Sequence, residues 1–424
     1  MTDRSKAPII YTDFDLTLSG IEETVFDNGC KLVCIPAKGS EIIKLDIILH
    51  AGRFQETKPA QSRMAFSTLF EGSSKITAND FNEKMDYYGA LISSKAGLDV
   101  STISLVCLKK YFPIVFPSWI EMIRTAQFPE KEIEIKKEIT IQNLERQLAK
   151  NNVVSYRELS SNIFGVDTAY GYNTQKNDIL QIDSNDLNTY HQEAINFTNA
   201  QIVLSGDVDD RAIQLIEKNI LQYISKPLKS PNYFTQNFVP EKKYIAGPQK
   251  NQVSIRLGRK LFAKGHPDFF AIEILNIALG GFFGSRLVSN IREDKGFCYH
   301  IDSTLDSMLY DGCMYISADV GNDHVSDTIR EIHNELHLIS EEKISDAELK
   351  MIKNYLKGQL LGLLDGPFAK ASLVKNYLLS GQDYKSFKDF PEFITDVNAE
   401  ILRDTANKYL KPEFFSVYVV GKTD

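Results

Sequence analysis

The spacing of hydrophobic positions along the chain predicts strands and helices that follow one another in a regular order. Apolar and polar residues alternate at 24–36, 42–50 and 100–108, which is the period of a strand with one buried face. Elsewhere the apolar positions recur every three or four residues, as on one face of a helix. The predicted helices are residues 59–70, 77–89, 111–126, 130–150, 155–164 and 186–195, and two more strands are predicted at 91–94 and 200–206.

The second half of the chain repeats this order from about residue 242, which indicates an internal duplication. The corresponding pairs are 42–50 with 253–261, 59–70 with 267–279, 100–108 with 312–320, 130–150 with 346–364, 186–195 with 399–410 and 200–206 with 415–421. Each copy is predicted to be an antiparallel sheet with helices packed on one face. The fold class is therefore α+β, with two homologous domains.

A stretch with several prolines and no hydrophobic period separates the two copies and is the predicted linker, residues 226–242. The predicted domains are accordingly residues 1–225 and 243–424. We expect the two domains to fold as separate units.

The composition is that of a globular protein that is neither disordered nor membranous. Of the 424 residues, 43% are apolar and 25% charged, and the net charge of −8 is spread along the chain. This distribution argues against nucleic acid and anionic membrane as partners. Residues 1–15 lack the basic and apolar regions of a signal peptide, so we expect a cytoplasmic protein. The five cysteines form no C-x-x-C pair and are expected to be buried free thiols.

One helix and the turn after it, residues 61–73 (QSRMAFSTLFEGS), carry a recognisable frame. Pro59 suits a first-turn position, apolar residues form one buried stripe, and Gly72 suits the residue after the last turn. The frame resembles the zinc-binding helix of the insulinase (pitrilysin) family of metallopeptidases, whose H-x-x-E-H motif is followed by an apolar run and a Gly-Ser or Gly-Thr turn.

Other stretches resemble the same family in the order in which its members have them. They are Asn-Ile-Phe-Gly at 162–165 with Tyr-Gly at 170–171, the closing strand at 199–208, Gly-Gly-Phe-Phe-Gly-Ser-Arg-Leu at 280–287, and Ile-Arg-Glu-Asp-Lys-Gly-Phe-Cys-Tyr at 291–299. The resemblance covers nearly the whole chain. It implies the duplicated α+β fold that the hydrophobic pattern also predicts.

The positions that hold zinc in this family carry other residues here. The two His positions are Arg63 and Ser67, the Glu position is Phe66, and the later Glu ligand is replaced by Asn143. Arginine has no lone pair for a metal, phenylalanine cannot move a proton, and serine and asparagine are poor zinc ligands. A shift of register would offer Glu145, without two further ligands. We therefore predict no catalytic residue and no metal site in this chain, and expect the zinc on a partner chain.

A second pair of histidines does not restore a metal motif. His333 and His337 lie one helical turn apart, but Glu335 stands between them and points to another side of the helix. Neither order of the known zinc motifs is met. A solvated helix face is the favoured interpretation.

The resemblance also implies a substrate-binding pair in the second half. Active members carry an Arg and a Tyr, seven residues apart, that bind the substrate carbonyl and backbone, and this chain has them as Arg292 and Tyr299. Their role would be to donate hydrogen bonds to a peptide oxygen as negative charge develops on it. The alternative is that Arg292 is an ordinary cation at a helix end and Tyr299 an ordinary strand aromatic.

Three functions remain open at this point. The first is a non-catalytic subunit of a heterodimeric zinc peptidase, because some bacterial and mitochondrial members of the family pair a zinc-bearing with a zinc-free chain. Its partners would be that zinc-bearing subunit and a peptide substrate, and the isolated chain could form a homodimer. The second is a peptidase-derived scaffold with no role in proteolysis. The third is an active peptidase that uses an unrecognised site.

Overall fold

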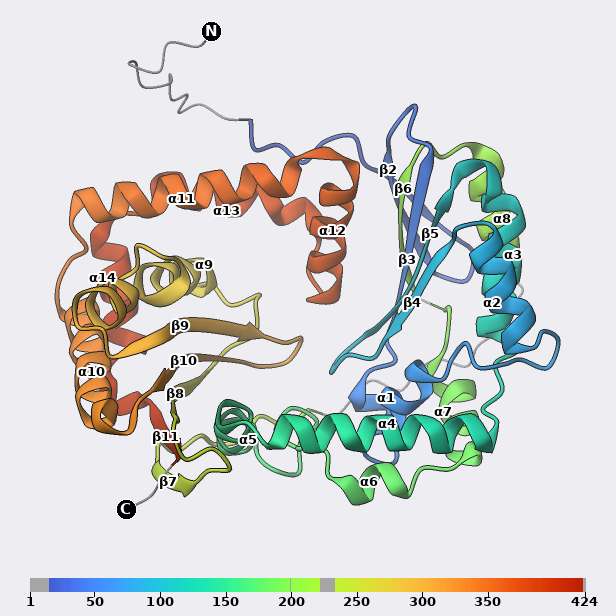
Figure 1. Ribbon diagram of the computed structural model, residues 1–424. Coiled ribbons are helices and arrows are strands. Elements are labelled where there is room, and N and C mark those ends of the chain that lie inside the picture. Colours follow the sequence, from blue (N-terminus) through green and yellow to red (C-terminus); the bar gives the residue numbers. More distant parts are fainter. Residues whose placement is uncertain (1–14, 199, 222–232, 422–424) are drawn as a thin grey trace, which may run out of the picture.

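The computed structural model describes residues 15–198, 200–221 and 233–421 and contains two β-sheets that face each other across the molecule (Figure 1). Residues 1–14 and residues 226–232 of the predicted linker lie outside the described residues. None of the described helices combines the length and the apolar character needed to cross a membrane.

The first half forms six strands and eight α-helices within the described residues. The strands are β1 (Glu22–Val25), β2 (Lys31–Pro36), β3 (Ile42–Leu49), β4 (Leu91–Lys95), β5 (Ser101–Leu108) and β6 (Gln201–Gly206). The helices are α1 (Gln61–Ser67), α2 (Ala78–Tyr87), α3 (Phe112–Arg124), α4 (Glu130–Leu148), α5 (Asn151–Phe164), α6 (Lys176–Leu180), α7 (Ser184–Ala194) and α8 (Asp210–Leu221). Short 3₁₀ turns η1 (Arg53–Gln55) and η2 (Lys109–Tyr111) precede α1 and α3.

The second half has the same kinds of element. Its strands are β7 (Lys242–Ala246), β8 (Val253–Leu261), β9 (Cys298–Ser307), β10 (Gly312–Val320) and β11 (Ser416–Gly421). Its α-helices are α9 (Phe269–Asn276), α10 (Val325–Glu341), α11 (Asp346–Leu364), α12 (Gly366–Leu379), α13 (Asp389–Asp396) and α14 (Ala399–Tyr409). Two π-helices, η3 (Ile277–Gly281) and η4 (Val288–Asp294), follow α9, and the 3₁₀ turns are η5 (Asn322–His324), η6 (Tyr384–Lys388) and η7 (Pro412–Phe414).

The two sheets share one topology, which confirms the α+β class with two homologous copies. Their strand orders are β1-β2-β6-β3-β5-β4 and β7-β11-β8-β10-β9, so they match strand for strand once β1 is set aside. The prediction of purely antiparallel sheets is wrong in one respect. β2 pairs parallel with β6, and β7 pairs parallel with β11. Each closing strand returns after a long excursion through helices, and such a crossover permits parallel pairing.

The start of α1 also differs from the sequence-based expectation. The helix begins at Gln61, after Ala60, whose φ of 72° lies in the left-handed region. Pro59 therefore precedes the first turn instead of occupying it. The Gln61 side chain stabilises this entry, because its Oε1 accepts a hydrogen bond from Thr57 N at 2.9 Å and its Nε2 donates to Asp186 O at 2.8 Å.

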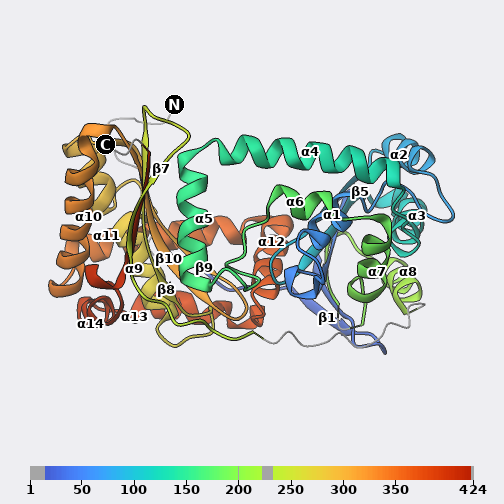
Figure 2. The same cartoon turned by 90° about the horizontal axis from the view of Figure 1, so that it is seen from below.

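One helix from each half packs on the sheet of the other half. Helix α12 packs on β2, β3 and β6 of the first sheet, and α5 packs on β8, β10 and β11 of the second (Figures 1 and 2). In β2, Leu32 faces the core of the first half while its neighbour Val33 joins the core of the second. This exchange differs from the expectation of separately folded units, since residues of the first sheet join the core of the second half and α5 forms a smaller cluster with residues of the second sheet.

Buried polar contacts anchor both exchanged helices. Lys375 of α12 forms an ion pair at 3.3 Å with Asp46 of β3, whose side chain is 1% exposed. At the start of α5, the Asn151 side chain donates hydrogen bonds to the carbonyls of Gln249 at 2.8 Å and Gln252 at 2.6 Å. Asp46 also pairs with Lys44 of its own strand at 3.6 Å, so two cations from the two halves share the compensation of this buried charge.

We therefore expect the two halves to stay together after the chain is cut between them. A protease site inserted within residues 226–242, once cleaved, should leave both fragments eluting as one particle in size-exclusion chromatography. Each half expressed alone should be unstable, because it would expose the surface that the exchanged helix covers. Two separately eluting, cooperatively folded halves would contradict this prediction, and the uncut protein with the same insertion is the control.

Candidate functional site

Helix α1 places the predicted metal positions in three different surroundings. Arg63 is exposed, Phe66 is 1% exposed and packs in the first core, and Ser67 is half-buried. The Ser67 hydroxyl donates to Met64 O at 3.0 Å, within its own helix. These positions therefore present a cation, an aromatic core residue and a hydroxyl that already has a partner.

Helix α4 runs beside α1 and carries the two candidates for the remaining ligand. Asn143 is exposed, and its Oδ1 accepts a hydrogen bond from Arg146 Nη2 at 2.8 Å. Glu145 is exposed and pairs with Lys176 at 2.9 Å. Neither side chain is buried with a further ligand.

The residues of this site do not fit a zinc ion. A protein zinc site needs three or four His, Cys, Asp or Glu ligands around one point. Among the described residues, no group of three such side chains could hold a metal. The predicted roles of the four changed positions, and the absence of a metal from this chain, stay predictions that require measurement.

The purified chain is expected to bind no stoichiometric zinc and to cleave no peptide alone. Replacing Ser67 with His should not create binding, because a single imidazole beside the Arg63 guanidinium supplies neither three ligands nor a favourable charge. Metal analysis after gel filtration checks both statements. About one zinc per chain, lost together with peptidase activity on chelation, would refute the prediction.

The histidines at 333 and 337 occupy separate surroundings on α10. Glu335 turns inward and accepts a hydrogen bond from Asn290 Nδ2 at 2.7 Å. His333 is half-buried, and burial lowers its pKa, whereas His337 is exposed. The structure brings no third ligand to them within the described residues.

A β-bulge exposes Tyr299. Strand β9 lies at the edge of the second sheet and, among the described strands, pairs with β10 alone, with His300 opposite Asp319 but Cys298 opposite Val320. Tyr299 is the extra residue between these pairs, and its neighbours Cys298 and Ile301 are 8% and 3% exposed. The bulge shifts the alternation of the strand by one position, and Tyr299 is left 96% exposed.

Arg292 reaches the same region from the π-helix η4. Its side chain is 40% exposed, pairs with the adjacent Glu293 at 3.4 Å, and lies over the ring of Phe283 at 5.8 Å. Phe283 is itself 68% exposed. An exposed aromatic ring therefore lies against the guanidinium, a combination common in binding surfaces. π-Helical turns occur often at functional sites because they displace side chains from the regular helical positions.

Arg292 and Tyr299 line one cavity of about 760 Å³. Its other walls include Glu293, Asp319 and His324, and the His324 ring stacks on Phe297 at 4.9 Å. The structure thus brings together the two side chains that the sequence analysis singles out. No observation here tests the role assigned to them, which stays a prediction.

Sequence reasoning missed the bulge that exposes Tyr299 and a group of arginines beside α1. The signal for the bulge was present, because apolar residues at 298 and 301 break the period of two within the strand. The arginine group, Arg53, Arg63 and Arg157, left no signal, since Arg157 lies far along the sequence from the other two.

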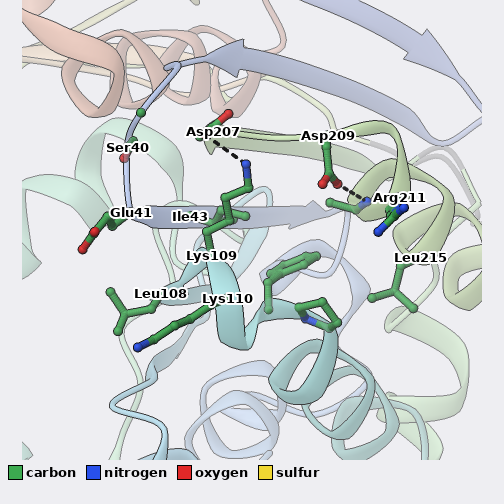
Figure 3. A pocket seen from close by; sticks show the side chains of 14 residues that line it. Ser40, Glu41, Ile43, Leu108, Lys109, Lys110, Asp207, Asp209, Arg211 and Leu215 are labelled. Carbon is green, nitrogen blue, oxygen red and sulfur yellow. Dashed lines mark hydrogen bonds and ion pairs between the residues drawn. The ribbon is translucent and has the colours of Figure 1, made fainter.

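A further cavity of about 770 Å³ lies at one end of the first sheet (Figure 3). Its apolar lining includes Ile43, Phe112 and Leu215, and Lys109 at its edge pairs with Asp207 at 2.9 Å. Both charged groups of that pair are thereby neutralised. We assign no function to this cavity.

Comparison with known proteins agrees with the architecture. The family model described as "Peptidase M16 inactive domain" matches residues 181–356. The chain is 23% identical to a Bacillus subtilis protein named "Uncharacterized zinc protease YmxG" over 389 residues, which cover 89% of this chain and 92% of that relative.

Solved structures share the fold over nearly the full length. A peptidase M16 inactive domain from Pseudomonas fluorescens aligns with a TM-score of 0.89 at 19% identity, covering 96% of this chain and 99% of that one. A protease from Helicobacter pylori aligns with a TM-score of 0.86 at 19% identity, covering 95% and 99%. The matched family model, the curated relative and the shared two-sheet fold show that this chain is similar to members of the peptidase M16 family, the family to which its sequence motifs also point.

Proposed function

We propose that this chain is the non-catalytic subunit of a heterodimeric zinc peptidase of its family. A partner chain would carry the zinc, and Arg292 and Tyr299 of this chain would bind the substrate peptide. The contrast between two sites carries the proposal. Arg292 and Tyr299 are exposed in one cavity, whereas Arg63, Phe66 and Ser67 offer nothing suited to a metal.

The chemistry of the pair suits the recognition of a peptide backbone. A guanidinium offers five N–H donors and the tyrosine hydroxyl one more, and both can point to a carbonyl oxygen. Donors that are already in place stabilise the negative charge that develops on this oxygen during hydrolysis. Zinc on the partner would activate the attacking water, a task for which this chain has no group in the described α1 site.

Two further observations support a link with peptides. β9, which carries Tyr299, is an edge strand, and an edge strand offers free backbone N–H and C=O groups to an extended chain. The curated relative from Bacillus subtilis is named a zinc protease, although that name describes the relative alone.

A reconstitution experiment tests the proposal. This chain is mixed with a family member from the same organism that has an intact H-x-x-E-H motif, and cleavage of a fluorogenic peptide library is measured. Activity should appear in the mixture and exceed that of either chain alone. If the two chains co-purify but the mixture cleaves no faster than the zinc-bearing chain, the scaffold function is favoured. The predicted cytoplasmic location also stays a prediction.

A further inference from the structure

An apolar surface lies beside Arg292, where the turn between η3 and η4 meets α11. The turn spans residues 282–285 and is closed by a hydrogen bond that Ser285 N donates to Phe282 O at 3.1 Å. Phe283, within this turn, is 68% exposed, and the Arg292 guanidinium lies 5.8 Å from the centre of its ring. The apolar surface therefore begins at the cavity that Arg292 lines.

Helix α11 supplies the rest of this surface. The ring of Phe282 stacks on that of Tyr355, with centroids 4.6 Å apart. Met351, one helical turn before Tyr355, is 42% exposed. The turn approaches Met351 as well, because a Cβ built at Gly284 would lie 3.7 Å from its Sδ. Four apolar side chains thus form one contiguous set, which we call the η3–α11 surface: Phe282, Phe283, Met351 and Tyr355.

The same face of α11 continues without a charged side chain. Met351, Tyr355, Gly358 and Gly362 are spaced four, three and four residues apart, so they lie in one row along the helix. A Cβ at either glycine would meet no atom within 4 Å, so this part of the helix surface is low and open. Residues 351–362 span about 16 Å at the rise of an α-helix, the length of about five residues of an extended peptide.

An ion pair holds the turn against α11. Arg286 Nε and Nη2 donate hydrogen bonds to Oε1 and Oε2 of Glu348, at 2.8 and 2.9 Å, and Glu348 lies in the first turn of the helix. Both side chains are half-buried, and a bidentate pair of this kind fixes the orientation of its two partners. Phe283 is therefore presented by an ordered turn, so that a ligand has little to order when it binds.

The composition of the η3–α11 surface is typical of a binding surface. Contiguous apolar side chains that remain in water usually mark a site that a ligand or partner covers. Aromatic residues and methionine are enriched in such sites, and methionine adapts its shape to different ligands. The hydroxyl in the set, that of Tyr355, accepts a hydrogen bond from Gln359 Nε2 at 2.6 Å. The surface thus offers a ligand mainly apolar contact.

We propose that the η3–α11 surface binds an apolar side chain, aliphatic or aromatic, of the peptide whose backbone Arg292 and Tyr299 bind. The inference rests on the proposed function for the ligand, a peptide, and for its position at Arg292. Contact between the two sites favours this occupant, because the guanidinium assigned to a peptide carbonyl already lies against Phe283. A side chain one or two residues from that carbonyl therefore reaches the surface. Phe283 and Met351 are then the residues that determine which side chain is preferred.

Binding of labelled decapeptides to the full-length chain tests the inference. Three uncharged peptides, acetylated and amidated at their ends, differ at one central position, which is Leu, Phe or Ser. Fluorescence anisotropy should show that the Leu and Phe peptides bind about tenfold to a hundredfold more tightly than the Ser peptide, the gain expected from burial of one apolar side chain. The preference should persist at high salt, because it does not depend on charge.

Phe283→Ser should weaken binding of the Leu and Phe peptides about tenfold and leave binding of the Ser peptide unchanged. Met351→Ser should act in the same direction, whereas Phe283→Leu, which keeps an apolar side chain, should retain most of the preference. Both serine variants should unfold at the wild-type temperature, because Phe283 and Met351 are exposed. Phe234→Ser, which removes a phenylalanine 75% exposed before β7, is the matched control and should change none of the affinities.

Equal affinity of the wild-type chain for all three peptides, or an unchanged preference in both serine variants, would overturn the inference. A wild-type dimer that Phe283→Ser dissociates in analytical ultracentrifugation, with no loss of peptide binding, would also overturn it, because a second copy would then cover the surface. The experiment needs no partner and measures no turnover. An apolar preference lost in Phe283→Ser therefore stands even if reconstitution fails, and an active pair without this preference leaves the proposed function intact and removes the inference.

Discussion

Arg292→Ala and Tyr299→Phe are each expected to lower kcat/KM of the reconstituted peptidase by about 10²–10³, the loss typical of one preorganised donor to a developing oxyanion. The effect should be large because each change removes a donor and little else. Arg292 contacts only the rim residues Glu293 and Phe283 among the described interactions, and Tyr299 is 96% exposed. The fold of the chain and the assembly of the pair should therefore persist.

The conservative variant Arg292→Lys should also have a low kcat/KM in the reconstituted peptidase. Lysine keeps the charge but offers a compact ammonium in place of the planar fork, so it cannot hold two acceptors in the same geometry. If charge alone mattered, Lys would restore most of the activity. Comparing Lys with Ala at this position therefore separates geometric recognition from simple attraction.

Matched controls exclude a general effect of surface change. Arg330→Ala removes another exposed arginine, and Tyr87→Phe removes the hydroxyl of a tyrosine 82% exposed on α2. Neither should alter turnover. Wild-type kcat/KM in both Arg292→Ala and Tyr299→Phe, with zinc content and assembly intact, would mean that the pair has no catalytic part, and the scaffold function would be favoured.

The hydrophobic pattern was sufficient to predict the class and the duplication. The same order of strands in the two sheets follows from the two copies of one pattern, and Thr77 caps α2 by accepting a hydrogen bond from Asp80 N. These features depend on residues a few positions apart. The parallel pairing of β2 with β6 was missed because it is decided by how the chain returns after many residues.

The period of hydrophobic positions could not predict that α5 and α12 each pack on the sheet of the other half. Both helices have buried residues suited to a sheet, but a hydrophobic face does not specify which of two similar sheets it will cover. The strands carry a clue in retrospect, because β2 is apolar at successive positions, Leu32, Val33 and Cys34, as expected for a strand covered on both faces.

The sequence indicated which residues belong to the candidate site but not how the fold exposes them. The resemblance to the family implied both Arg292 and Tyr299, but their exposure depends on a π-helix and a bulge that a regular pattern does not contain. The cluster of Arg53, Arg63 and Arg157 is a purely tertiary feature. Arg53 and Arg157 meet because both donate hydrogen bonds to carbonyls of the loop at 169–174, an arrangement that no local rule supplies.

The packing of α5 on the second sheet can be tested by substitution of one residue, Gly258 of β8. A Cβ built at this position would overlap Cδ2 of Leu159 and lie 3.1 Å from its Cγ, and Leu159 belongs to α5 of the other half. Leu159 is 1% exposed and cannot turn out to solvent. Gly258→Ala should therefore push α5 from the sheet and reduce the free energy of unfolding by about 1–3 kcal/mol, as overpacking does.

A double-mutant cycle tests whether this loss comes from the contact between the halves. Leu159→Ala alone should reduce the free energy of unfolding by about 2–5 kcal/mol, because it leaves a cavity under α5. In the double variant the new methyl group occupies part of that cavity. The combined loss should thus fall short of the sum by about 0.5–3 kcal/mol, the range for residues in contact. Urea denaturation followed by circular dichroism gives all four values.

Gly358→Ala in α11 is the matched control, since its added Cβ meets no atom within 4 Å. In a helix interior this change should raise the free energy of unfolding by about 0.5–1 kcal/mol.

Strict additivity of Gly258→Ala and Leu159→Ala would show that α5 does not lie on β8 in solution. A single cooperative transition is also expected in every variant, because α5 and α12 each pack on the sheet of the other half. Separate transitions would mean that this exchange couples the two halves only weakly.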